Sequence, residues 1–205
     1  MKHIYFVTAT NTDVGKSYAC EVLLKRFSKT SKVGYFKPIE TGVIDTPIDG
    51  TKLLNLTQQL NPEFDYSIQD IVPYQFTLPA APFVANQTEK DIDISLILEK
   101  AKQLLNKCDT LLVEGAGGLM VPILKDYFMI DLIKEFQDSL QAKTILIAPS
   151  NLGSINDTLL SQKALNSYKI EYQWYINLYK DKESFDSVTL PFYENYFEKI
   201  DFLEN

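Results

Sequence analysis

The sequence predicts an α/β fold with a mainly parallel sheet and helices on both faces. Short runs rich in β-branched and aromatic residues alternate with segments whose apolar residues recur at helical spacing. This alternation is typical of strand–helix–strand units, which build buried parallel sheets. No repeat, charge run or Gly/Ser-rich linker divides the 205 residues, a length that suffices for one domain with its own core. We therefore expect a single domain over residues 1–205.

The individual elements follow from local patterns, taken in chain order. The first strand is HIYFVTA at residues 3–9, and a helix at 16–27 would place Ala19, Val22, Leu23 and Phe27 on one face. The remaining expected strands are 32–38, 109–114, 143–149 and 171–177, and the remaining expected helices are 49–60, 94–105, 129–140 and 155–168.

Residues 61–88 interrupt this alternation. The segment carries four prolines (Pro62, Pro73, Pro79 and Pro82) and shows no sustained period. An excursion of this kind in a compact domain is often a functional loop. Ligands of open parallel sheets bind beyond the carboxyl ends of the strands, so the site residues are expected at the strand ends.

Composition and charge exclude several classes of function. The net charge is −7 with no Lys/Arg-rich stretch, which argues against nucleic acid or an anionic membrane as the main partner. No apolar run approaches membrane-spanning length, and the N-terminus has the pattern of a strand rather than a signal peptide. Cys20 and Cys108 lack metal-ligand or redox spacing, so we expect reduced structural thiols in a cytoplasmic protein.

The chain has one histidine, His3, within the first expected strand. A Ser-His-Asp or Cys-His catalytic site is therefore not expected, and neither is a histidine-rich zinc site. Phosphoryl transfer remains open, because it depends on positioning and cations more than on an imidazole base.

The stretch TATNTDVGKS, residues 8–17, resembles a phosphate-binding loop. The common pattern G-x-x-x-x-G-K-[ST] would place its first glycine at Thr10, but Gly15, Lys16 and Ser17 fit it. The loop follows a strand and opens a helix, so its backbone N–H groups and the helix dipole can face phosphate oxygens. Lys16 would reach the outer phosphates and Ser17 would bind Mg²⁺. The alternative is an ordinary turn whose serine caps the helix.

Charged residues also follow the second and third strands of the expected sheet. Lys37 ends the second strand, where it would place another cation over the phosphate site. Glu114 ends LLVE in the manner of a Walker B acid, before a glycine-rich turn that leaves room for a ligand. Asp49 heads a helix, as a cap or a further Mg²⁺ ligand. APSNLGSIND, at 148–157, opens another helix that suits a carboxylate or phosphate, or is simply capped by Ser or Asn.

These motifs resemble the dethiobiotin synthetase family. Its loop is G-T-D-T-x-V-G-K-[TS], with five residues between the glycines, and ATNTDVGKS matches that register with Ala9 for the first glycine and Asn11 for the usual Asp. GYFKPIETG, VPYQFTLPAAPF, VEGAGG and LGSIN are similar to further family segments, in order, between residue 4 and about residue 178. The resemblance implies a P-loop NTPase-like synthetase fold and a homodimer.

The resemblance also implies a reaction. ATP and Mg²⁺ would drive carboxylation of 7,8-diaminopelargonate by CO2, through a carbamate and a carbamic–phosphoric anhydride, to the cyclic urea. The implied catalytic residues are Lys37, Lys16 and Thr12, and the implied metal ligands are Ser17, Asp49 and Glu114. The implied nucleotide ligands are Asp13, Val14, Gly15, Lys16, Ser17, Tyr18, Glu114, Gly115, Ala116, Gly117 and Asn177. The implied substrate ligands are Thr12, Lys37, Thr41, Pro79, Ala81 and Gly118, with Asn151, Leu152, Gly153, Ser154, Ile155 and Asn156 holding the substrate's tail carboxylate from the second subunit.

The sequence departs from the family pattern in two places. Ala81 stands where the family often has serine. After Asn177, the later family segment that helps to select adenine is not recognisable, with Leu190-Pro191 its nearest remnant, so we expect a shortened base-binding region and weak selectivity for the base. Residues 168–202 hold 11 of the 25 aromatic residues, a concentration that favours a packed C-terminal layer or a dimer surface over adenine stacking.

Three other functions compete with this interpretation. A partitioning-type ATPase switch would carry a signature lysine and glycines where Asn11, Thr12 and Asp13 stand. A cobyrinate-type amidating synthetase usually brings a glutaminase domain, for which 205 residues leave no room. A non-catalytic relative is disfavoured because Lys37 and Glu114 are both present.

Overall fold

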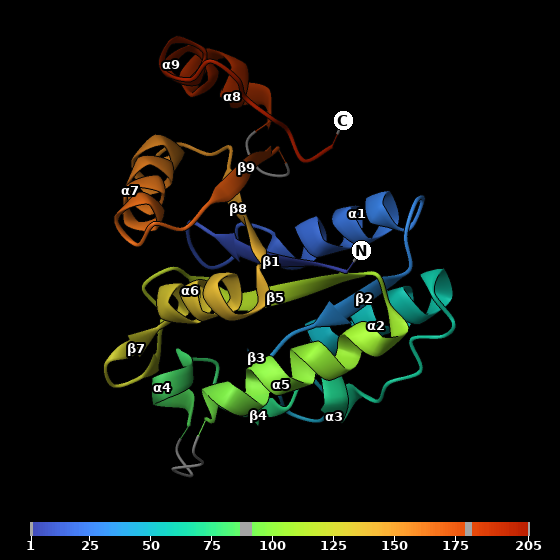
Figure 1. Ribbon diagram of the computed structural model, residues 1–205. Helices are drawn as coiled ribbons and strands as arrows, with labels where there is room; N and C mark the ends of the chain where they lie inside the picture. The colour runs from blue at the N-terminus through green and yellow to red at the C-terminus, as the bar shows by residue number, and fades with distance from the viewer. Residues whose placement is uncertain (1, 87–91, 179–181, 205) are drawn as a thin grey trace.

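A five-stranded parallel sheet forms the centre of the protein (Figure 1). The computed structural model describes residues 2–86, 92–178 and 182–204. The strand order is β2-β5-β1-β8-β9, and every neighbouring pair is parallel. The strands are β1 (His3–Ala9), β2 (Val33–Phe36), β5 (Thr110–Gly118), β8 (Lys143–Pro149) and β9 (Tyr172–Asn177). The predicted α/β fold with a parallel sheet is therefore confirmed.

Helices cover both faces of this sheet (Figure 1). The chain leaves β1 toward β2 in one direction and leaves β5 toward β8 in the other, so right-handed crossovers put the connecting helices on opposite faces. On the first face α1 packs with α2, and on the second α5 packs with α6. The long helices are α1 (Lys16–Phe27), α2 (Ile48–Leu60), α5 (Ile94–Leu104), α6 (Met129–Leu140) and α7 (Ser154–Ser167), and a 3-10 turn, η1 (Leu105–Lys107), follows α5.

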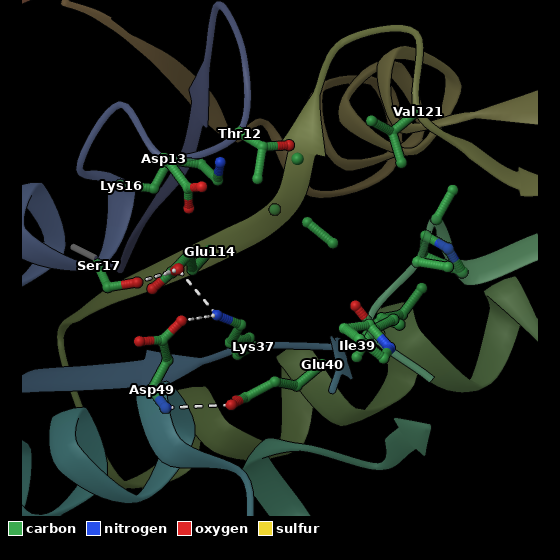
Figure 2. Close-up of a pocket in the computed structure, with 18 of the residues that line it drawn as sticks. Thr12, Asp13, Lys16, Ser17, Lys37, Ile39, Glu40, Asp49, Glu114 and Val121 are labelled. Carbon is green, nitrogen blue, oxygen red and sulfur yellow. Dashed lines mark hydrogen bonds and ion pairs between the residues drawn. The ribbon is translucent and has the colours of Figure 1, made fainter. Parts of the chain in front are cut away.

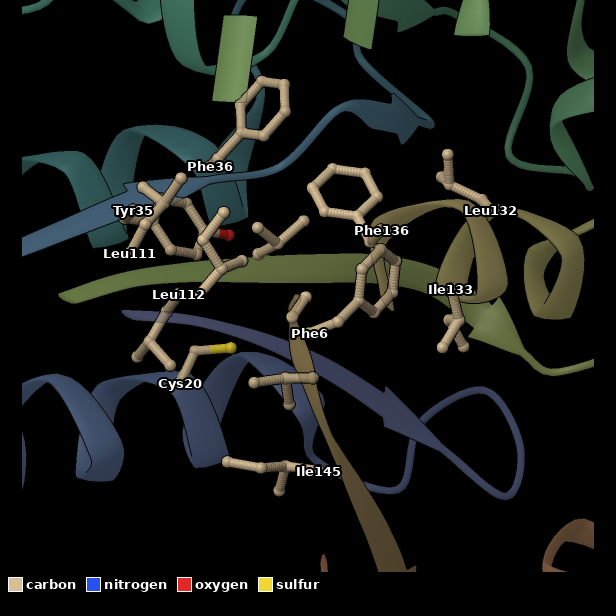
Figure 3. Close-up of a cluster of buried hydrophobic side chains, with 14 of the residues drawn as sticks. Phe6, Cys20, Tyr35, Phe36, Leu111, Leu112, Leu132, Ile133, Phe136 and Ile145 are labelled. Atoms are coloured by element: carbon tan, nitrogen blue, oxygen red, sulfur yellow. The ribbon is translucent and has the colours of Figure 1, made fainter. Parts of the chain in front are cut away.

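The core lies between the sheet and these helices (Figure 3). Phe6 of β1 and Phe136 of α6 are fully buried and meet edge to face, with ring centroids 5.2 Å apart. Leu111 and Leu112 of β5, which lies between β2 and β1, are also fully buried. The apolar run that predicted this strand reflects the burial of the strand on both faces. This burial fixes the strand in the sheet, and so fixes the position of the residues at its carboxyl end.

The proline-rich segment is partly ordered into short elements. β3 (Ile39–Thr41) continues from the end of β2 and pairs in parallel with β4 (Tyr74–Phe76). α3 (Ile68–Ile71) precedes β4, and α4 (Pro82–Ala85) follows it with a proline at its first position. The loop predicted at 61–88 thus holds two short helices and a strand over its described part, and residues 87 and 88 lie outside the described residues.

Two further differences from the predicted elements concern β5 and the C-terminus. β5 does not end at Glu114 but runs on through the glycines to Gly118, and a hairpin of β6 (Pro122–Leu124) and β7 (Tyr127–Phe128) follows. After β9 the chain forms α8 (Lys182–Val188) and α9 (Leu190–Tyr196). Within residues 2–86, 92–178 and 182–204, no helix has the length and apolar character needed to cross a membrane.

The aromatic residues near the C-terminus pack as a separate layer, as the sequence predicts for this region. Its buried centre is Ile176, Phe185 and Tyr193. Trp174 of β9 contacts Phe197, with ring centroids 4.8 Å apart. The layer sits on the outer strand of the sheet and is tied to it by backbone hydrogen bonds, since the N–H of Leu203 donates to the carbonyl of Ile176 over 3.0 Å.

Candidate active site

A cavity of about 890 Å³ opens at the carboxyl ends of β2 and β5 (Figure 2). The loop before α1 forms one wall, the start of α2 forms the floor, and the Pro79–Pro82 segment with β3 forms the opposite wall. This is the place that the general rule for parallel sheets predicts. The predicted site residues that line the cavity are Thr12, Asp13, Gly15, Lys16, Ser17, Tyr18, Lys37, Thr41, Asp49, Pro79, Ala81, Glu114, Gly115, Ala116 and Gly117.

The phosphate loop has the backbone shape that its glycine predicts. Gly15, just before α1, has φ 86°, in the left-handed region that glycine adopts without strain. The non-glycine residue Asp13 also has positive φ, 58°. The Nζ of Lys16 points back to the carbonyl of Asn11, 3.5 Å away. The loop therefore directs the amino end of α1 toward the cavity, and that helix end carries unsatisfied N–H donors.

Lys16 is largely buried, and this burial affects the pKa of its ammonium group. Burial lowers the pKa of Lys16 below the ordinary lysine value; nearby Glu114 partly opposes this shift, and Lys37 adds to it. A cation held at such a cost gains most when an anion arrives. The loop is thus electrostatically suited to bind phosphate groups.

Lys37 lies between two carboxylates (Figure 2). Its Nζ is 2.7 Å from Oδ2 of Asp49 and 3.0 Å from Oε1 of Glu114. Burial opposes the charge on Lys37, but Glu114 and Asp49 outweigh it and raise the pKa of this lysine. The pKa of Asp49 is lowered, because Lys37 more than offsets the burial that opposes its ionisation. Lys37 and Asp49 are therefore both charged at neutral pH.

Glu114 accepts hydrogen bonds from three side chains. Its Oε1 accepts the hydroxyl of Ser17 over 2.9 Å as well as the ammonium of Lys37, and its Oε2 accepts the phenol of Tyr35 over 2.7 Å. Only 1% of Glu114 is exposed. Burial of a carboxylate is costly unless donors satisfy its oxygens, and here both oxygens have partners. The sequence analysis did not identify Tyr35, although its position two residues before Lys37 on a strand signals a shared face.

Glu40 is a second residue that the sequence analysis left without a role. Its Oε1 accepts the backbone N–H of Asp49 over 3.0 Å, and its Oε2 accepts that of Gly50 over 2.9 Å. The carboxylate thereby caps the amino end of α2, which the preceding Pro47 leaves without a side-chain cap. Burial raises the pKa of Glu40. The contact fixes the first turn of α2 and so places Asp49 beside Lys37.

The donor set at this point fits Mg²⁺. Ser17, Asp49 and Glu114 supply hydroxyl and carboxylate oxygens, the hard ligands that Mg²⁺ prefers. Asp49 and Glu114 flank the ammonium of Lys37, and Ser17 donates to Glu114, so the protein already holds one positive charge there. In the described part of the chain there is no group of three or more His, Cys, Asp or Glu side chains that could hold a metal alone.

Some predicted site residues lie away from this cavity. Asn177 is buried behind the phosphate loop, and its Nδ2 donates to the carbonyl of Val14 over 3.0 Å. Neither of them lines the cavity, and nor does Gly118, whose position would bring a Cβ within 3.1 Å of the carbonyl of Thr10. Asn177 thus anchors the loop, whatever else it contacts when a nucleotide is bound.

The other predicted residues outside the cavity form the turn from Asn151 to Asn156, before and within the first turn of α7. Gly153 has φ 93° and Leu152 is 79% exposed. Ser154 is buried, and its Oγ accepts the hydroxyl of Tyr193 over 3.4 Å. The turn is therefore an accessible helix amino end tied to the C-terminal layer, where Leu190-Pro191 opens α9.

Comparison with known sequences gives consistent matches. A model of an AAA domain family matches residues 3–176. The chain is 53% identical to the ATP-dependent dethiobiotin synthetase BioD of Sulfurovum sp. (strain NBC37-1), over 94% of this chain and 90% of that protein. It is 37% identical to the protein of the same name from Wolinella succinogenes, over 95% and 90% of the two chains. A third such protein, from Methanocaldococcus jannaschii, is 34% identical over 98% and 89%.

Solved structures share the fold at much lower identity. A GTPase in its apo form from Pyrococcus abyssi aligns with a TM-score of 0.57 and 15% identity, covering 98% of this chain and 76% of that one. A plasmid partition protein from Borrelia burgdorferi aligns with a TM-score of 0.56 and 14% identity, over 98% and 87%. These likenesses support the P-loop NTPase fold and no particular activity.

Proposed function

The chain belongs to the family of ATP-dependent dethiobiotin synthetases, ATP-hydrolysing ligases, and we propose that it converts 7,8-diaminopelargonate, CO2 and ATP to dethiobiotin. The observation that carries this proposal is the position of Lys37. Its ammonium faces the same cavity as Lys16 and the amino end of α1, between two carboxylates that are suited to a metal. Two cations over one phosphate site suit a reaction in which two anions must meet.

The proposed chemistry has three steps. One neutral amine of the substrate adds to CO2, which forms a carbamate and releases a proton. A carbamate oxygen then attacks the γ-phosphorus of ATP and expels ADP, which gives a carbamic–phosphoric anhydride. The second amine attacks the carbamoyl carbon, closes the cyclic urea and expels phosphate. CO2 supplies the nucleophilic group after it adds to the amine, so the sequence needs no histidine base.

The main electrostatic barrier is the approach of the carbamate to the γ-phosphate. Two unit charges 4 Å apart repel by about 4 kcal/mol at an effective dielectric constant near 20. Lys16 and Lys37 would offset this repulsion and stabilise the charge that develops on the transferred phosphoryl group. Mg²⁺ held by Ser17, Asp49 and Glu114 would add positive charge at the phosphate oxygens.

The wall opposite the phosphate loop would hold the diamine. Thr12 of the phosphate loop and Thr41 of the opposite wall would hydrogen-bond the carbamate or the amines, and Pro79 and Ala81 would shape the site. The tail carboxylate would meet the turn at 151–156 of a second subunit, where the exposed amino end of α7 suits an anion. A homodimer is proposed for this reason.

The nucleotide base would lie near Asn177 and the C-terminal layer. Because the adenine-selecting segment of the family is not recognisable here, we propose weak discrimination between bases.

Cys20 and Cys108 are both buried free thiols, which supports a reducing, cytoplasmic setting.

The direct test is to incubate the protein with diaminopelargonate, bicarbonate, Mg²⁺ and ATP, and to detect dethiobiotin by mass spectrometry. We expect one ADP and one phosphate per cyclic urea, and label from ¹³C-bicarbonate in the urea carbonyl. ATP hydrolysis that needs no diamine would instead indicate a nucleotide switch. Product formation only with glutamine would indicate an amidating synthetase.

A further inference from the structure

We propose that Tyr35 is a positioning residue for Glu114, holding one carboxylate oxygen so that the other faces Ser17, Lys37 and the metal position. This inference rests on the proposed function of the same site. The two carboxylate oxygens of Glu114 have different hydrogen-bond partners. Oε2 accepts the phenol of Tyr35 over 2.7 Å, whereas Oε1 accepts Ser17 over 2.9 Å and Lys37 over 3.0 Å.

Tyr35 acts from behind the site rather than within it. It lies on β2, where it pairs in register with Leu112 of β5, and its side chain is fully buried in the core (Figure 3). It is not among the residues that line the cavity, although Glu114 and Lys37 are. The hydrogen bond to Glu114 therefore links the hydroxyl of Tyr35 to the cavity.

The hydrogen bond between Tyr35 and Glu114 restricts rotation of the Glu114 carboxylate. Rotation of the Glu114 carboxylate would leave a buried phenol without its acceptor, and an unsatisfied buried donor is costly. The sheet pairing of β2 with β5 fixes the distance between the two backbones, so neither residue can follow the other. The outward direction of Oε1 is therefore set before any ligand arrives.

A phenol also has a chemical advantage over a cationic partner. A phenol donates a hydrogen bond without carrying a charge at neutral pH. It stabilises the negative charge of Glu114 without adding a positive charge that would repel Lys37 or a metal. Partners that orient a metal-ligating carboxylate in this way tune its affinity for the metal.

The test is the substitution Tyr35→Phe, which removes the hydroxyl and keeps the ring. Mg²⁺ is titrated by calorimetry into the protein saturated with a non-hydrolysable ATP analogue. We expect about a tenfold weaker Mg²⁺ affinity, in the range reported for partners of metal ligands. Affinity for the analogue in EDTA should change little, because Tyr35 does not line the cavity. The matched control is Tyr66→Phe, whose hydroxyl donates to the carbonyl of Gln103 outside the cavity.

A second substitution, Tyr35→Met, also removes the hydroxyl and replaces Tyr35→Phe if that variant does not fold. Whichever variant folds must bind Mg²⁺ more weakly than the wild-type protein. A lower melting temperature with unchanged Mg²⁺ affinity would overturn the positioning role and leave a purely structural one. The binding measurement does not need the diamine. If wild-type protein makes no dethiobiotin but Tyr35→Phe still weakens Mg²⁺ binding, the positioning role stands and the proposed function fails.

Discussion

Lys37 Nζ lies 2.7 Å from Oδ2 of Asp49, so the cation proposed for catalysis is paired with a carboxylate proposed for the metal. Glu114 completes the pairing from the other side at 3.0 Å. One ammonium thus bridges two acidic side chains in the ligand-free protein and offsets the repulsion between them. Any cation that binds these acids competes with Lys37 and leaves its charge available to anionic ligands of the cavity.

Replacing Lys37 separates its role in turnover from any role in nucleotide binding. For Lys37→Ala we expect turnover to fall by about 10²- to 10³-fold, the usual cost of removing one group that stabilises a transition-state charge. Nucleotide affinity should change less than about threefold, because Lys16 and the loop backbone remain in place. Steady-state kinetics and equilibrium binding give the two numbers. Equal losses of turnover and of nucleotide affinity would make Lys37 a nucleotide ligand instead. The control is Lys32→Ala, which removes a lysine from an exposed ion pair with Glu63.

Removing the carboxylate of Glu40 should loosen α2. In Glu40→Ala two backbone N–H groups of the first turn lose their acceptor. We expect the free energy of unfolding to fall by about 1–2 kcal/mol, as for loss of a helix cap. Turnover should also fall, because Asp49 in the first turn of α2 is no longer held beside Lys37. Chemical denaturation measures the first effect. Glu40→Gln keeps one acceptor and should lose about half as much stability; a variant as stable as wild type would show that the cap is not needed.

Alkaline pH should move nucleotide affinity and stability in opposite directions. The pKa of Lys16 is lowered below 10.5, chiefly by burial. As pH rises through this lowered pKa, the folded protein loses the proton before the unfolded chain does, so unfolding binds a proton and the ligand-free protein gains stability. Nucleotide affinity falls over the same interval because the cation is lost. Lys37, whose pKa is raised, stays charged there.

The measurement for this pH effect is nucleotide affinity by fluorescence or calorimetry between neutral pH and the ordinary lysine value. In Lys16→Ala the affinity should be weak at every pH and should no longer decline in that interval. A decline of the same size in this variant would assign the titration to another group.

Nucleotide selectivity tests the interpretation of the C-terminal region. We expect ATP, GTP and CTP to compete within about tenfold of one another, which is about 1.4 kcal/mol, because the segment that would hydrogen-bond one base selectively is not recognisable. Competition against a labelled nucleotide measures this directly. A much larger preference for ATP would mean that Asn177 and the C-terminal layer select adenine without the family segment.

Strong local patterns made much of the fold predictable. The bounds of β1, α1, α6 and β8 match those expected, because each combines a clear period with a distinct end. The short strands β3, β4, β6 and β7 were missed, since two or three residues carry no period and form only where a partner strand lies. β5 continues beyond Glu114 because Gly118 pairs with Ala9, a contact between distant parts of the chain.

The candidate site divides in the same way. Lys16, Ser17, Lys37, Asp49 and Glu114 stand at strand ends or helix starts, which topology brings to one edge of the sheet. Tyr35 and Glu40 have roles that depend on which atom lies opposite them, and no local pattern encodes that. The grouping of these residues at one cavity was therefore predictable from position and chemistry, whereas the contacts of Tyr35 and Glu40 required the structure.

Close packing at the other end of β2 gives a prediction about stability alone. A Cβ on Gly34 would lie 2.6 Å from Sγ of Cys108 and 2.7 Å from Cε2 of Phe64. Gly34→Ala should therefore destabilise the fold by about 1–3 kcal/mol through overpacking. This corresponds to a melting temperature lower by about 2–4 °C per kcal/mol for a chain of this size. The site lies at the opposite edge of the sheet, so turnover at low temperature should be retained.

The double variant Gly34→Ala/Cys108→Ala decides whether the clash with Cys108 is the cause. Cys108→Ala removes the nearer sulfur and alone costs stability, because it leaves a buried void. If the clash matters, the two losses are not additive, and the double variant is more stable than their sum by about 0.5–3 kcal/mol, as for residues in contact. Additive losses in thermal unfolding would place the strain at Phe64, whose ring is fully buried and has little room to move.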